Sequence, residues 1–126
     1  MEFKELEIKV IKWAKDKNLL DVKTNYQQYA KFLEEGTEIL DAMNKLRVVE
    51  DKANKLDVTD ADQMANHKHI LDEAELELKD AFGDTIVTLI ILAGKYKINL
   101  IDCLELAYNE IKGRTGKTVG GTFIKD

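Results

Sequence analysis

The sequence predicts an all-α domain, a bundle of four or five helices that occupies residues 1–126 as a single unit. Apolar residues recur at helical spacing along most of the chain, and acidic residues cluster at the same spacing. The chain also contains no proline, which a helical bundle can do without but which sheet-rich and loop-rich folds usually carry. A length of 126 residues suits one domain with a modest core.

Apolar stripes predict the first two helices. The first helix covers about residues 3 to 17. Its stripe consists of Phe3, Leu6, Val10, Ile11, Trp13 and Ala14. Residues 18–24 form a connection, and a second helix is predicted from about Asn25 to Glu50. Its stripe includes Tyr29, Phe32, Leu33, Ile39, Leu40 and Met43.

The middle of the chain predicts an interruption followed by a third helix. Residues 51–66 are polar and weakly patterned, which indicates a loop or mobile insertion, and Thr59–Asp62 resembles a capping box for the next helix. The run Thr85–Ala93 contains residue types that favour strands, but the helically spaced charges before it favour one continuous helix, buried on most sides. Gly83 inside this helix costs about 1 kcal/mol relative to alanine, so we expect a backbone or ligand close to it.

The C-terminal quarter predicts a fourth helix and a tail. Asn99 gives a cap-like start, and the helix is expected to continue to about Lys112, with Gly113 ending it. The tail, residues 114–126, combines turn residues with the apolar pair Phe123 and Ile124. We expect this tail to dock on the body of the domain.

Composition excludes several classes of function. The formal net charge is −5 and no basic stripe is present, so nucleic acid is not expected as a direct partner. The single cysteine, Cys103, excludes an internal disulfide and suits a reducing compartment. The charged N-terminus lacks the apolar core of a signal peptide, and no apolar stretch is long enough to span a bilayer. We therefore expect a cytoplasmic protein without a membrane partner.

Two acidic clusters lie beside apolar residues that are expected to be buried. They consist of Glu34, Glu35 and Glu38, and of Glu77, Asp80 and Asp84. A helix advances about 100° per residue, so each cluster gathers its carboxylates within about a third of a turn. Two such faces pressed together concentrate negative charge at a cost that a cation offsets, and Mg²⁺ with oxygen ligands commonly partners phosphates. Because 34% of the residues are charged, a solvated acidic surface is the alternative.

The end of the fourth predicted helix is a candidate for binding phosphate. Asn109 and Lys112 share a helix face, and with Arg114 and Lys117 beyond them they offer donors and positive charge to phosphate oxygens. The alternative is that basic residues favour helix C-termini because of the helix dipole.

Two further motifs do not support a site. The segment Gly116–Thr118 ends like a P-loop, but the glycine required five positions earlier is Ile111. His67 and His69 lie two residues apart and therefore point to different sides of a helix, which favours surface histidines. A phosphotransfer bundle that uses either histidine is a rival function.

Taken together, these motifs resemble the MazG-type all-α nucleoside triphosphate pyrophosphohydrolases, particularly the small single-domain forms of phages and bacteria. The first acidic cluster reads EExxE, the sequence GDTIVTL places Asp84 at the last aspartate of ExxD, and AYNEIKGR places Asn109 at the family asparagine. The resemblance covers about residues 25 to 124.

The sequence departs from the family pattern in two respects. The glutamate expected three residues before Asp84 is Ala81, with Asp80 one step earlier, and Glu77 with Asp80 also spells ExxD. The register of the second motif therefore stays open. The polar residues 51–66 also separate the two acidic motifs farther than is usual.

The resemblance implies an Mg²⁺-dependent enzyme, with Mn²⁺ as a substitute, that cleaves nucleoside triphosphates between the α- and β-phosphates. It implies Glu35, Glu38, Asp80 and Asp84 as metal ligands, and Glu34 as the general base or as a ligand of a second metal ion. It also implies substrate contacts from Asn109, Lys112, Arg114 and Lys117. It also implies a homodimer or tetramer, and the apolar face around residues 85–93 requires such a cover. The base pocket is expected to use aromatic side chains such as Trp13, Tyr26 or Tyr29, which the sequence does not rank. The alternative is a non-catalytic helical interaction or regulatory module that has kept this fold.

Overall fold

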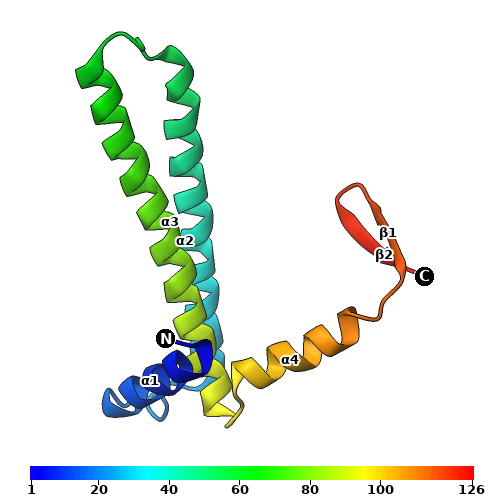
Figure 1. The fold of residues 1–126 in the computed structure, drawn as a ribbon. Helices are drawn as coiled ribbons and strands as arrows, with labels where there is room; N and C mark the ends of the chain where they lie inside the picture. The colour runs from blue at the N-terminus through cyan, green and yellow to red at the C-terminus, as the bar shows by residue number, and fades with distance from the viewer.

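The computed structural model describes residues 1–126 and contains four α-helices and a small antiparallel sheet. The elements are α1 (Phe3–Asp16), α2 (Asn25–Lys52), the 3₁₀ turn η1 (Ala53–Lys55), α3 (Ala61–Lys95), α4 (Leu100–Ile111), β1 (Gly116–Val119) and β2 (Thr122–Lys125). Figure 1 shows α2 and α3 as a long antiparallel pair with α1 at its base. Helix α4 leaves the same base and leads away to the two strands (Figure 1).

Side-chain caps and small residues shape the α2–α3 pair. Thr24 and Gln27 form a reciprocal capping box at the start of α2, with bonds of 3.1 and 2.9 Å. Between the helices, Ala42 of α2 and Ala74 and Ala81 of α3 are buried. Because alanine is small, these positions allow two helix backbones to approach closely. The pair therefore brings its flanking side chains within reach of each other.

Buried polar contacts join the elements at the base of the pair. The Gln28 amide donates a hydrogen bond to the Thr88 carbonyl at 3.2 Å, which links α2 to α3. The Lys95 ammonium donates to the carbonyls of Leu20 and Lys23, and the buried Glu7 carboxylate accepts the backbone N–H at the start of α4. The bonds of Lys95 and Glu7 satisfy backbone groups that a connection or a helix start leaves without a partner.

Several predicted elements are confirmed. Helices α1, α2 and α4 begin and end within two residues of the predicted positions. The run Thr85–Ala93 lies inside α3, so the prediction of one continuous helix is correct. Within this chain the run is only partly covered, because Ile90 and Ile91 are buried whereas Ile86 is 42% exposed.

The predicted loop or mobile insertion at residues 51–66 is mostly helical. Helix α2 continues to Lys52, η1 follows it, and α3 already begins at Ala61. The N-cap of α3 is Asp60 rather than Thr59, because the Asp60 carboxylate accepts the N–H of Gln63 at 3.1 Å. Nearly all side chains at this tip of the helix pair face solvent, so no apolar stripe marks the helices in the sequence.

The C-terminal tail does not dock on the body, contrary to the prediction. It forms a β-hairpin in which Lys117 pairs with Ile124 and Thr118 with Phe123, and every residue of the hairpin is exposed. Gly120 and Gly121 both have positive φ, which a two-residue hairpin turn requires. The tail therefore pairs with itself, and the fold is all-α apart from this hairpin. The expectation of a close neighbour at Gly83 is also not met within this chain, since a Cβ there would have nothing within 4 Å.

Much apolar surface is left uncovered in the single chain. Only 9 of the 126 residues are buried, which is a small core for this length. Helix α4 exposes Leu104, Leu106, Tyr108 and Ile111. None of the helices combines the length and the hydrophobicity that a membrane crossing requires.

Substitution of Thr24 tests how much the capping box at the start of α2 stabilises the fold. Thr24→Ala removes the oxygen that accepts the Gln27 N–H, so we expect the free energy of unfolding to fall by about 1 kcal/mol. Thr24→Ser keeps this oxygen and should retain most of the stability. Chemical denaturation at a fixed protein concentration measures both variants. Equal stability of Thr24→Ala and the unchanged protein would contradict this role.

Candidate metal centre

The two acidic clusters face each other across the α2–α3 pair. A cavity of about 290 Å³ lies between the helices beside the buried Ala42 and Ala81. Its charged lining consists of Glu38, Asp41, Lys45, Glu77, Asp80 and Asp84. Five carboxylates and one lysine thus share one small space, which gives it a strongly negative character.

Three carboxylates come closest together beside this cavity. One carboxylate oxygen each from Glu35, Glu38 and Asp84 lies within 4.8 Å of the other two. Oxygens that bind one Mg²⁺ sit about 2.1 Å from the ion, so ligand oxygens on a shared ion are separated by no more than about 4.2 Å. Small side-chain rotations would bring these three oxygens to that separation.

One oxygen of Glu35 is paired with Lys31, whereas the other has no hydrogen-bond partner. Its Oε2 is buried and has no hydrogen-bond partner, although the side chain as a whole is 13% exposed. A buried carboxylate oxygen without a hydrogen-bond partner carries a desolvation cost. A hard cation at this point would offset it, and an all-oxygen ligand set suits Mg²⁺ or Mn²⁺.

The pKa values of Glu38 and Lys31 are both shifted by the carboxylates around them. A hydrogen bond to the Glu35 carboxylate raises the pKa of Glu38, and the negative charges of Glu35 and Glu34 raise it further. The hydrogen bond between Lys31 and Glu35 raises the pKa of Lys31, because it stabilises the ammonium. In this form of the protein, Lys31 is the nearest positive charge to Glu35, with Nζ 3.1 Å from Oε1.

The structure brings three of the four predicted metal ligands together. Glu35, Glu38 and Asp84 come together, whereas Asp80 lines the neighbouring cavity outside this group. Glu77 is drawn away by an ion pair with Lys45 at 3.1 Å.

Glu34, the predicted general base, does not join the three carboxylates. Its side chain is 63% exposed and lies 3.4 Å from the Lys31 ammonium. The sequence reasoning overlooked Lys31 and Lys45 as members of the site. Lys31 precedes Glu34 and Glu35 by three and four residues, and this spacing was the available signal.

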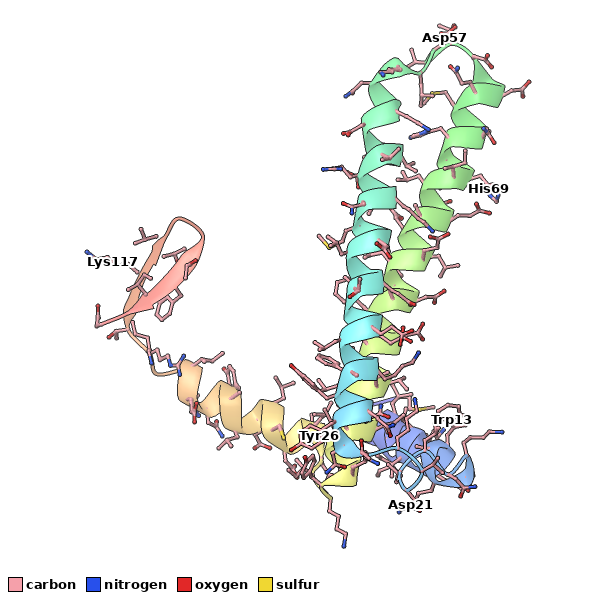
Figure 2. All side chains as sticks on the ribbon, turned by 180° about the vertical axis from the view of Figure 1, so that it is seen from behind. Trp13, Asp21, Tyr26, Asp57, His69 and Lys117 are labelled. Carbon is pink, nitrogen blue, oxygen red and sulfur yellow. The ribbon has the colours of Figure 1, made fainter.

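The predicted substrate contacts lie elsewhere in the chain. Asn109 belongs to α4, and Lys112, Arg114 and Lys117 follow on toward the hairpin. Figure 2 shows Lys117 well apart from the α2–α3 pair. Within one chain these residues and the carboxylates therefore do not form a common site.

The histidines are not part of the carboxylate site. His69 points outward from the upper part of α3 (Figure 2), and its Nε2 lies 3.0 Å from Glu73 of the same helix. His69 is thus a surface histidine as predicted, whereas His67 is half-buried.

Comparisons of the chain with protein-family models, with curated proteins and with solved structures found no match. The family resemblance therefore stays a prediction, and the function has to be argued from the geometry of the site.

The raised pKa of Glu38 predicts how stability depends on pH in the metal-free protein. Because its folded-state pKa lies above the ordinary value of 4.5, Glu38 favours folding below pH 4.5 and loses this contribution as the pH rises through the folded-state pKa. Glu38→Gln should therefore raise the melting temperature at neutral pH in EDTA. Glu75→Gln, at an exposed position of α3, controls for the general loss of one negative charge. An equal rise in both variants would contradict local repulsion at Glu38.

Cation binding tests which carboxylates form the centre. Asp84→Asn removes one of the three grouped carboxylates, so we expect the affinity for Mg²⁺ and Mn²⁺ to fall at least about tenfold. Glu34→Gln changes a carboxylate outside the group and should retain most of the affinity. Isothermal titration calorimetry measures both. An absence of binding to the unchanged protein, or equal losses in the two variants, would contradict the centre.

Proposed function

We propose that this protein is an Mg²⁺-dependent nucleoside triphosphate pyrophosphohydrolase, which converts a ribo- or deoxyribonucleoside triphosphate to the monophosphate and pyrophosphate. The observation that carries the proposal is the group of Glu35, Glu38 and Asp84, whose carboxylate oxygens lie within 4.8 Å of one another. The buried Oε2 of Glu35, which has no hydrogen-bond partner, supports it, because a cation beside this atom would offset the cost of its burial. Clustered oxygen ligands favour Mg²⁺, and Mg²⁺ in proteins commonly carries phosphate.

The residues in and around the three-carboxylate group would have different roles in such a reaction. Glu35, Glu38 and Asp84 would hold Mg²⁺, with Asp80 beside them in the cavity. Bound Mg²⁺ would supply charge neutralisation for the triphosphate and a lowered pKa for a water molecule. Glu34 lies outside the three-carboxylate group and pairs with Lys31 at 3.4 Å, and its exposed carboxylate would accept a proton from the attacking water.

Positive side chains next to the carboxylates are available to the phosphates. Lys31 lies beside Glu35, and Lys45 lies in the acidic cavity. Charge-assisted hydrogen bonds from ammonium groups to phosphate oxygens are among the stronger polar contacts. The two lysines would therefore orient the triphosphate over the site.

We further infer that the protein works as a homodimer or tetramer. The apolar side chains of α4 are exposed and the core of the single chain is small. Contact with a second copy would bury these apolar side chains. In such an assembly, Asn109, Lys112 and Arg114 of one copy would approach the carboxylates of another. This arrangement would give the predicted phosphate contacts a role that they do not have within one chain.

A non-catalytic interaction module is the second candidate. Ala81 favours it, because a buried alanine stands where the family pattern expects a ligating glutamate. In such a module the acidic groups would be balanced internally, as Glu77 already is by Lys45.

Pyrophosphate release separates these candidates. We expect the folded protein to release pyrophosphate from at least one member of a panel of ribo- and deoxyribonucleoside triphosphates with Mg²⁺, and EDTA should abolish the release. Glu38→Gln should lower kcat/KM by about 100-fold or more, because it removes a ligand that holds the ion. Glu75→Gln serves as the matched control and should stay active. No release from any nucleotide by the folded protein would defeat the enzymatic proposal and favour the module.

A further inference from the structure

A second cavity adjoins the metal centre at the base of the helix pair. It has a volume of about 350 Å³ and is lined by side chains from α1, the following connection, α2 and α3. Figure 2 shows Trp13 on α1 beside the lower ends of α2 and α3. Glu35 and Asp84 line this cavity and also belong to the three-carboxylate group. A molecule in the cavity would therefore lie directly beside the metal centre.

The walls of this cavity differ in chemistry from the acidic centre. Trp13, Leu19, Val87 and Ile91 supply an aromatic ring and apolar surface. The remaining lining residues are polar or charged: Lys23, Gln28, Lys31, Glu35, Asp84 and Thr88. The volume lies in the range of small-molecule sites, which combine apolar walls with polar groups that fix the orientation of the ligand. The indole ring offers a flat surface on which another planar ring can stack.

Gln28 is the most deeply buried polar residue that lines the cavity. Its side chain lines the cavity and the residue is only 3% exposed. Its Nε2 donates one hydrogen bond to the Thr88 carbonyl at 3.2 Å, which fixes the orientation of the amide. A primary amide has a second N–H and a carbonyl oxygen, so it can pair with a neighbouring donor and acceptor on the edge of a heterocycle.

The other apolar cavity does not offer this combination. It has a volume of about 460 Å³ and lies farther along the α2–α3 pair, between Val48 and Ile70. No aromatic side chain lines it, and its amide, Asn44, is exposed. Tyr26, which is 87% exposed, and Tyr29 do not line the cavity at Trp13. Trp13 is thus the one aromatic residue of the three sequence candidates that stands beside the metal centre.

We propose that the cavity at Trp13 binds the nucleobase of the nucleotide substrate, with the Trp13 ring stacking on the base and the Gln28 amide reading its hydrogen-bonding edge. This inference rests on the proposed nucleotide substrate and assigns its base to a definite site. The triphosphate then extends past Glu35 and Asp84 toward the metal centre. Lys31, which lines the cavity beside Glu35, stands at the boundary between base and phosphates.

The fluorescence of Trp13 provides a direct test, because it is the only tryptophan in the chain. The protein is titrated in EDTA with a panel of nucleoside monophosphates, so that no hydrolysis is needed for the signal. We expect at least one nucleotide to quench the fluorescence saturably. Inorganic triphosphate and ribose 5-phosphate, which lack a base, should leave it unchanged.

Two variants separate base reading from a general effect on the fold. Gln28→Met keeps the length of the side chain but removes the amide. The preferred nucleotide should therefore bind at least about tenfold more weakly, and the differences in affinity among the bases should become smaller. Calorimetry on Trp13→Leu, a change at a half-exposed position, should show the same weakening while Mg²⁺ binding stays intact. Tyr26→Leu, outside the cavity, should behave like the unchanged protein.

The outcomes distinguish this inference from the proposed function. Saturable quenching without pyrophosphate release would support the base site and defeat the enzyme. Pyrophosphate release without quenching by any nucleotide would overturn the base site and leave the enzyme standing. Unchanged base preference in Gln28→Met and Trp13→Leu would also overturn it.

Discussion

The close contact of α2 with α3 is the constraint on which the rest of the structure depends. Ala42 and Ala81 are buried between the helices, and their small size lets the two backbones approach. This approach brings carboxylates of both helices together, with oxygens of Glu35, Glu38 and Asp84 within 4.8 Å. The hydrogen bond with Glu35 raises the pKa of Glu38, and the negative charges of Glu35 and Glu34 raise it further. The helix pair thus holds negative charge where a divalent cation would relieve it.

The spacing of apolar residues along the sequence was enough to predict most of the helices. The helices with one apolar side were found within two residues of their ends, and the charge spacing before Thr85–Ala93 correctly favoured a helix over a strand. Periodicity failed at residues 51–66, because helices surrounded by solvent need no apolar stripe. The spacing of apolar residues also gave no information on the tail, because the position of the tail depends on whether the body offers a surface for it to pack against. The Gly120–Gly121 pair was the available signal for a hairpin.

The candidate site was predictable as far as single helices determine it. The spacing of Glu35 and Glu38 puts both on one face of α2, whatever the partner. The rotation of α3 against α2 decides which residues of the second cluster meet them, and only the packed structure selects Asp84 over Glu77. The position of α4 likewise depends on contacts made at the base of the pair, so sequence spacing could not tell that Asn109 lies apart from the carboxylates within one chain.

A crystal structure of the protein with Mn²⁺, read through the anomalous signal of the metal, tests the central claim most directly. The account predicts an ion between α2 and α3 that is bound by the carboxylates of Glu35, Glu38 and Asp84. The account would be contradicted if those side chains pointed into solvent at saturating Mn²⁺, or if the ion were bound only elsewhere.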